Sequence, residues 1–202
     1  MRIYILRHGQ TDLNSEKRFQ GQMQTELNEV GIAQSEKVAE LLSERDIKFD
    51  KIYCSPLERA IKTAEIVTSE DRDKFIIDDD LAEIDFGINE GRKYDELHGD
   101  KSNIFLSPGN YIPPEGGESL ETLKFRVKRF LERVRDENSE GNILAVSHGT
   151  AIHMMLLYMR GMEFSDLWTE HVGNCNVKVV DVEGWELKVR DDLQIETDKY
   201  IK

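Results

Sequence analysis

Two short motifs that could bind an anionic ligand follow predicted strands of this chain. Arg7-His8-Gly9 follows the apolar run at 2–6, and Ser147-His148-Gly149 completes and follows the apolar run at 142–147. Each motif joins an imidazole, which can attack or hydrogen-bond a ligand, to a glycine that lets the main chain turn and approach closely. If the two strands are neighbours in an open parallel sheet, both histidines lie at the edge where ligands bind.

Arg7 and Arg59 would add positive charge to this edge. Arg59 lies on a predicted helix that is otherwise apolar on one face and that follows a short predicted strand at 51–55. A buried arginine is costly unless it is paired, and a phosphate dianion matches its fork of donors. A single His-Gly pair is common and has little meaning alone. Two such pairs with two arginines, next to helix N-termini that offer free N–H groups, indicate a phosphate site.

Strand-like and helix-like segments alternate along the chain, which predicts an α/β layer fold. The almost continuous apolar run at 142–147 is typical of a central parallel strand. The apolar residues of 118–134 follow the i, i+3, i+4 spacing of an amphipathic helix. The full set of expected elements is strands at 2–6, 51–55, 75–79 and 142–147, and helices at 25–45, 57–70, 118–134 and 150–159.

Local signals refine these expectations. Ser55 and Pro56 are typical of an N-cap followed by the first position of a helix. Ser119 offers half a capping box, because Thr rather than Glu or Gln stands at position 122. The runs on either side of Glu183-Gly184 predict a hairpin at a sheet edge. Residues 85–118, rich in glycine, proline and charge, are expected to form an irregular lid or substrate loop.

Composition limits the classes of partner. The chain has 202 residues, a formal net charge of −13 and 39% hydrophobic residues, which suits one globular domain over 1–202. The acidity argues against nucleic acid and anionic membrane as partners. Cys54 and Cys175 form no CxxC pair, so a reducing cytoplasm is expected. The start of the chain is too short for a signal peptide, and the apolar stretch 154–159 is too short for a membrane span.

Taken in order, the motifs resemble the histidine phosphatase superfamily, in its phosphoglycerate-mutase-like branch. They are "LRHGQTDLN", "RFQG", "LNEVG", "SPLERAIKTA", "LAEIDFG", "GGES" and "SHGTAI", collinear from residue 4 to about residue 152. The resemblance implies a three-layer α/β/α sandwich with a mostly parallel central sheet. It implies a metal-independent phosphatase that needs no cofactor and acts on a small phosphorylated metabolite.

The resemblance also assigns roles to residues. His8 would be the nucleophile and become a phosphohistidine, Glu83 would be the general acid, and Arg7, Arg59 and His148 would hold phosphoryl oxygens. The substrate pocket would be lined by Thr11, Asn14, Gln20, Gly21 and Gly149.

Physical chemistry supports these roles independently. Because the transition state of phosphoryl transfer is loose, positioning and charge stabilisation provide most of the catalysis. His8 must be neutral to attack, and neighbouring arginines would lower its pKa. Its other ring nitrogen must be held as a donor, for instance to a backbone carbonyl. Glu83 could protonate the leaving alkoxide and then activate water. From the residues alone, Glu83 is favoured only weakly over Asp85.

Other sites are less favoured. Metal-dependent hydrolysis would use His8, His148 and the acidic run at 78–85, but no HxH, HExxH or paired-cysteine spacing is present and the arginines would repel a cation. "CSPLER" lacks the glycines of a cysteine-phosphatase cradle, so Cys54 is expected to be buried and inert. His98, His153 and His171 are expected to be structural or exposed. Arg92, Lys93, Tyr94 and Lys101 are the obvious candidates for contacting the rest of a substrate, although simple exposure is favoured for each.

Three functions remain open from the sequence. A phosphatase is favoured over a mutase, because the mutases of this family that we compare with are longer and carry an ERHYG-like motif that this chain lacks. A catalytically silent phosphate-binding module is the third alternative. Among phosphatases, the motifs resemble both the α-ribazole-phosphate type and the types that act broadly on sugar or amino-acid phosphates. An edge strand near 172–182 could pair across a homodimer, but nothing in the sequence requires it.

Overall fold

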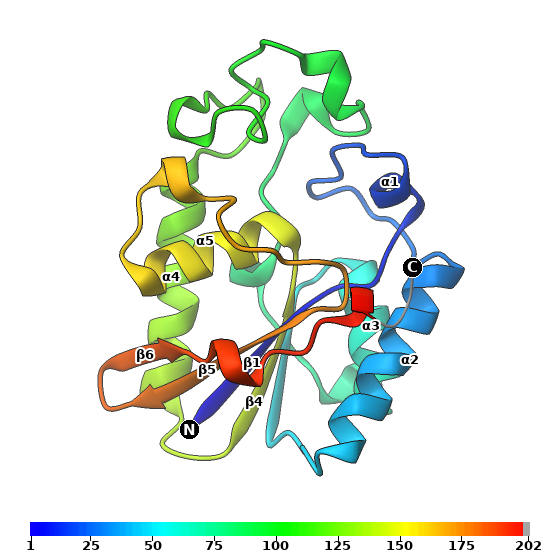
Figure 1. The fold of residues 1–202 in the computed structure, drawn as a ribbon, viewed down its shortest axis with the longest axis vertical. Helices are drawn as coiled ribbons and strands as arrows, with labels where there is room; N and C mark the ends of the chain where they lie inside the picture. Colours follow the sequence, from blue (N-terminus) through cyan, green and yellow to red (C-terminus); the bar gives the residue numbers. More distant parts are fainter. Residues whose placement is uncertain (200–202) are drawn as a thin grey trace.

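A six-stranded sheet forms the centre of the computed structural model, which describes residues 1–199 (Figure 1). In spatial order its strands are β3 (Ile76–Ile77), β2 (Lys51–Cys54), β4 (Asn142–Ser147), β1 (Arg2–Arg7), β5 (Val177–Glu183) and β6 (Glu186–Val189). The first four run parallel, and β5 and β6 are antiparallel to their neighbours. The mostly parallel sheet expected from the sequence is therefore confirmed, with 142–147 at its centre.

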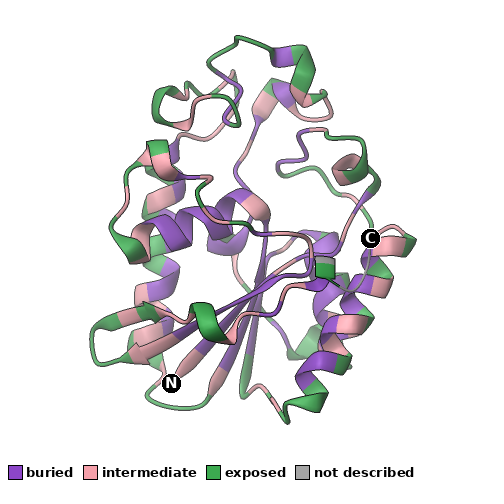
Figure 2. Cartoon of the chain, in the orientation of Figure 1, coloured by how far each residue is buried: buried purple, intermediate pink, exposed green. Residues whose placement is uncertain are grey.

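Helices cover both faces of this sheet. Along β1, Ile3 and Ile5 pack into the cluster that contains α4 (Leu120–Glu137) and α5 (Gly149–Arg160). Tyr4 and Leu6 point to the opposite cluster, with α2 (Glu29–Glu44) and α3 (Glu58–Thr68). The alternation follows from the two-residue period of a strand. The result is the expected three-layer α/β/α sandwich, whose inner strands are buried (Figure 2).

Polar caps set the starts of two helices. Asn28 caps α2 by accepting from the N–H of Gly31, so this helix begins at residue 29 rather than 25. Ser119 caps α4 by accepting from the N–H of Thr122, which confirms the half capping box. The short helix α1 (Asp12–Ser15) is capped by Thr11.

Two local predictions were wrong. Ser55 does not cap a helix: α3 begins at Glu58, and the Ser55 hydroxyl instead bonds the ring of His148. The strand expected at 75–79 keeps only Ile76 and Ile77, because the side chain of Asp78 accepts from the N–H of Asp80 and starts a 3-10 turn. Asp78 and Asp80 also pair with Arg133 and Arg129 of α4, which ties this turn to the helix layer.

Irregular segments gather above the carboxyl end of the parallel strands (Figure 1). Residues 85–118 contain 3-10 turns and an isolated bridge from Lys93 to Arg18 but no α-helix or strand, which confirms their irregular character. They pack against the loop after α1 through Phe19, whose ring contacts Phe86 and Tyr94. The 3-10 turns of the chain are Arg72–Lys74, Asp79–Leu81, Gly87–Asn89, Tyr94–Leu97, Pro108–Asn110, Phe164–Asp166, Asp191–Leu193 and Thr197–Lys199. The predicted hairpin is β5–β6, with β6 at the sheet edge. The edge strand expected near 172–182 was wrong, because β5 lies between β1 and β6 and pairs with both. Within residues 1–199, no helix has the length and apolar character that crossing a bilayer requires.

Two glycines allow the turn after β1 to press against the start of α2. A Cβ on Gly9 would lie 2.5 Å from the carbonyl oxygen of Gly31, and a Cβ on Gly31 would lie 2.1 Å from that of Gln10. Main-chain atoms cannot yield as a flexible side chain could. The glycines therefore fix where the residues after β1 sit.

We predict that Gly31→Ala lowers the free energy of unfolding by about 1–3 kcal/mol, because it overpacks this contact. The substitution should also reduce activity by displacing the turn that carries His8. Urea unfolding checks the first effect. Glu36→Ala, at an exposed position of the same helix, should change the free energy by less than about 0.5 kcal/mol. Equal effects of the two substitutions would contradict the prediction.

Candidate active site

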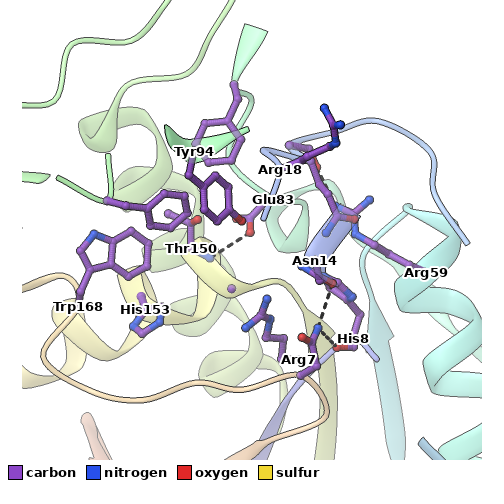
Figure 3. A pocket seen from close by; sticks show the side chains of 16 residues that line it. Arg7, His8, Asn14, Arg18, Arg59, Glu83, Tyr94, Thr150, His153 and Trp168 are labelled. Carbon is purple, nitrogen blue, oxygen red and sulfur yellow. Dashed lines mark hydrogen bonds between the residues drawn. The ribbon is translucent and has the colours of Figure 1, made fainter. Parts of the chain in front are cut away.

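A cavity of about 310 Å³ lies where β1, α3 and α5 meet the irregular segments (Figure 3). Because β1 and β4 pair in parallel with Arg7 opposite Ser147, the two His-Gly motifs meet at this edge, as expected. Most of the predicted site residues line the cavity, namely Arg7, His8, Asn14, Gln20, Gly21, Arg59, Glu83 and Gly149. Thr11 and His148 do not; both are buried beside it.

His8 is fixed as a neutral imidazole with one free lone pair. Its Nδ1 lies 2.6 Å from the carbonyl oxygen of Gly9. A carbonyl can only accept, so Nδ1 carries the proton and Nε2 keeps its lone pair. Burial lowers the pKa of His8 well below its usual value, and the charges of Arg59 and Arg7 lower it further. The expected donor to a backbone carbonyl is thus confirmed.

His148 lies next to His8, with 5.0 Å between the ring centroids. Its Nε2 is 2.7 Å from the hydroxyl of Ser55, which also accepts from the N–H of Leu57 at 3.3 Å. A hydroxyl has one hydrogen and two lone pairs, so Ser55 can either donate to Nε2 or accept a proton from it, and this choice decides which ring nitrogen of His148 carries the proton. The Nδ1 of His148 is buried and has no hydrogen-bond partner among the described residues. Burial, and then the charge of Arg59, lowers the pKa of His148 well below its usual value.

Arg59 carries a completely buried charge, with 0% of its surface exposed. Its Nη1 donates to the carbonyl of Met23 and to Thr25, and its Nη2 donates to the carbonyl of Gly21. All three acceptors are neutral, and Nε has no partner among the described residues. Burial lowers the pKa of Arg59 to about 10, so the group remains charged at neutral pH.

Arg7, at the end of β1, is the second arginine of the cavity. Its Nη1 donates to the carbonyl of Val172 at 2.7 Å, which anchors the guanidinium to the loop before β5. Gly149 lies against this guanidinium, since a Cβ there would lie 3.4 Å from its carbon. The Arg7 side chain thus joins the end of β1 to both the α5 turn and the loop before β5.

Glu83 occupies the N-terminus of α5. Its Oε2 accepts from the N–H of Thr150 at 3.0 Å (dashed in Figure 3), and its Oε1 accepts from those of Ala151 and Ile84. We expected such helix N–H groups to face a ligand anion, but the carboxylate of Glu83 takes two of them. The partial positive charge of a helix N-terminus suits this carboxylate.

Arg126 holds the segment that presents Glu83. From the buried face of α4 it donates to the carbonyls of Asp80, Ala82 and Glu83, and it pairs with Glu118. This residue was not predicted from the sequence. The available signal was an arginine placed between Leu123 and Val127 on the otherwise apolar face of that helix.

Asn174 was also missed. Its Nδ2 donates to the carbonyl of His8 at 3.1 Å and to Asn14 Oδ1 at 3.2 Å, and its side chain lines the cavity. Thr11, predicted to line the substrate pocket, instead caps α1 and donates to Gln20 at 2.9 Å. Thr11 therefore orients Gln20, which lines the cavity, without lining the cavity itself.

Several residues expected to be structural or exposed also line the cavity. These are His153 and Tyr94, together with Arg18, Phe86, Phe105 and Trp168, which the sequence did not single out. His98, His171, Lys93 and Lys101 are exposed, as expected. Cys54 and Cys175 are buried, unbridged thiols, and burial raises the pKa of Cys175 to about 12. Across residues 1–199, no three His, Cys, Asp or Glu side chains group as metal ligands would.

Comparison with known proteins identifies relatives along nearly the whole chain. Residues 3–191 match the model of the histidine phosphatase superfamily (branch 1). The chain is 33% identical to phosphoglycerate mutase-like protein 4 of Arabidopsis thaliana, covering 95% of this chain and 85% of that one. It is 30% identical to adenosylcobalamin/alpha-ribazole phosphatase of Escherichia coli K12, covering 83% of each chain.

One solved structure adds a ligand to this comparison. It is phosphoserine phosphatase from Entamoeba histolytica in complex with 3-phosphoglyceric acid, 28% identical to this chain with a TM-score of 0.82. The match covers 93% of this chain and 94% of the other.

The buried neutral histidines predict acid lability. His8, His148 and His153 all have a lowered pKa, to about 3 for His153, where burial is the largest cause. Below about pH 6.5 these rings bind protons in the unfolded chain but stay neutral in the folded protein. The free energy of unfolding therefore falls as pH falls.

We predict that His153→Gln reduces the slope of the free energy of unfolding against pH by up to about 1.4 kcal/mol per pH unit between pH 6 and pH 4. This is the slope produced by one proton that binds only the unfolded chain. Urea unfolding at a series of pH values measures the slope. His98→Gln, at an exposed position, should keep the slope of the native protein. A His153→Gln variant with an unchanged slope would refute the buried neutral state of His153.

Proposed function

Since the chain belongs to the histidine phosphatase superfamily (branch 1), we propose that it hydrolyses a small phosphomonoester through a phosphohistidine on His8. The observation that carries the proposal is the state of His8. Its Nδ1 proton is held by the carbonyl of Gly9, its Nε2 lone pair is available, and it lines a cavity with Arg7 and Arg59. The names of the relatives, which include phosphatases, support the same chemistry.

The reaction comprises two displacements. Nε2 of His8 attacks phosphorus, the bond from phosphorus to the ester oxygen breaks, and the leaving oxygen takes a proton from Glu83. Water then attacks the phosphohistidine, its proton passes to Glu83, and the phosphorus–nitrogen bond breaks to release inorganic phosphate. Dividing the reaction this way replaces one very slow hydrolysis with two easier steps.

The charged and polar groups around His8 suit the phosphoryl group. Arg7 and Arg59 would balance its negative charge, and Nδ1 of His148 would donate to one oxygen. That role matches its missing hydrogen-bond partner among the described residues and requires the tautomer in which the Ser55 hydroxyl donates to Nε2. Because these donors are held in place before the substrate binds, they lose little energy to rearrangement during the reaction.

Glu83 is placed to exchange protons with the ester oxygen. Among the described residues its Oε2 accepts one N–H, that of Thr150, and so keeps a lone pair that can carry a proton. It lines the same cavity as His8, whereas Asp85 does not line it. Instead, Asp85 accepts from the N–H of Gly87 in the following turn. This placement is why we assign the acid role to Glu83.

We predict that His8→Ala lowers kcat/KM for an aryl phosphate by at least about 10⁴-fold, because no other group can form the covalent intermediate. Activity of the native protein should be unaffected by EDTA, as expected for a metal-independent reaction. Phosphate release measured with and without chelator tests both points. Loss of activity in EDTA would indicate a metal enzyme. Transfer of phosphate to a second alcohol without hydrolysis would indicate a mutase, and absence of any turnover would indicate a binding module.

We predict that Glu83→Gln slows hydrolysis of an alkyl phosphate by about 10²–10⁴-fold, the usual contribution of a general acid. The first turnover of 4-nitrophenyl phosphate should be affected far less, because nitrophenolate leaves without a proton. Stopped-flow absorbance of the nitrophenolate burst separates these steps. Asp85→Asn is the matched control and should leave both substrates nearly unaffected. If Asp85→Asn instead produced the selective loss, the acid would be misassigned.

A further inference from the structure

Aromatic side chains form the part of the cavity that lies away from the residues assigned to the phosphoryl group. Figure 3 shows Tyr94 and Trp168 on the side of the cavity opposite Arg59. Phe86 and Phe105 line the cavity with them, and we call these four residues the aromatic wall. Three come from the segment 85–118, and Trp168 comes from the loop after α5.

The aromatic wall is held rigidly. The ring of Phe105 lies 4.4 Å from that of Tyr94 and 5.0 Å from that of Trp168, measured between centroids. Phe19 stacks on Phe105 at 5.5 Å, and the indole N–H of Trp168 donates to the carbonyl of Ile104 at 3.0 Å. Phe105 is still 37% exposed, so its ring is accessible to a ligand. A wall set in place before binding costs a ligand little in ordering.

The same side of the cavity offers little to an amino-acid or sugar-acid carboxylate. Arg18 lines the cavity, but its Nε donates to Glu16 at 2.6 Å and its Nη1 donates to the carbonyl of Gly91. His153 packs against Trp168 and is uncharged at neutral pH, because burial lowers its pKa to about 3. The other arginines that line the cavity, Arg7 and Arg59, are those assigned to the phosphoryl group.

We propose that the aromatic wall is a subsite for a flat, weakly polar ring on the alcohol half of the substrate. This inference rests on the proposed phosphomonoesterase activity. It makes the substrate class phosphomonoesters whose alcohol carries an aromatic or heteroaromatic ring, rather than phosphoserine-like acids. A volume of about 310 Å³ is at the low end of the roughly 300–1,000 Å³ of ligand pockets. It suits a phosphoryl group with one ring system.

Binding of paired phosphonates, which cannot be hydrolysed, tests the subsite without depending on turnover. Calorimetry should show 2-phenylethylphosphonate binding more tightly than ethylphosphonate by about tenfold, because the ring is buried against aromatic faces. Phe105→Leu keeps an apolar side chain but removes the ring, and should reduce this ratio by about threefold to tenfold. Ethylphosphonate should bind the variant as it binds the native protein.

Phe125→Leu is the matched control. Phe125 is 65% exposed on α4 and does not line the cavity, so its substitution should leave the ratio unchanged. In turnover, kcat/KM should be higher for 2-phenylethyl phosphate than for ethyl phosphate or O-phosphoserine. The subsite would be overturned if the native protein bound the two phosphonates with equal affinity, or if it bound O-phosphoserine more tightly than 2-phenylethylphosphonate. It would also be overturned if Phe105→Leu lowered the affinity for both phosphonates equally. Ring-selective binding without turnover of any ester would support the subsite and refute the hydrolase.

Discussion

The central constraint on this molecule is the positive charge of Arg59, buried with only neutral oxygens as hydrogen-bond partners. Removing an ion from water costs several kcal/mol unless another charge compensates for it. The loop at 21–25 wraps the guanidinium and lowers that cost, and the carboxylates of Glu83 and Glu90 attract its charge without a hydrogen bond to it. A phosphoryl dianion beside His8 would add the negative charge that these groups do not place against the guanidinium. Burial lowers the pKa of His8 most, and the Arg59 charge lowers it further, so this arginine contributes to both binding and nucleophilicity.

The rest of the fold positions the two histidines and the carboxylate of Glu83 around the cavity. Gly9 and Gly31 let the turn after β1 touch α2, and Ser55 and Asn174 orient His148 and the main chain of His8. Glu83, which lines the same cavity as Arg7 and Arg59, is held by helix N–H groups and by Arg126. These supports come from separate elements, so the site exists only when the whole sandwich has folded.

The sequence allowed most of the fold and the reactive groups to be predicted. Strands with continuous apolar runs, such as 142–147, and helices with a clean period, such as 118–134, were found because burial alone specifies them. Ser55 was misjudged because its capping signal is local, whereas its partner His148 is 93 residues away. Asn174 and Trp168 were missed for the same reason, because their contacts depend on loops whose approach no periodicity reveals. Arg126 did have a periodic signal, its place on the apolar face of α4, but its partners lie in the segment at 80–83 and at Glu118.

The most direct test of the account is to trap the intermediate. The protein is mixed with a phosphomonoester, quenched in alkali within milliseconds, digested with trypsin, and analysed by mass spectrometry. The account predicts an acid-labile phosphate on the peptide that begins at His8 and ends at Lys17, located on His8 itself. Phosphate on another residue, or turnover without any phosphorylated peptide, would contradict it.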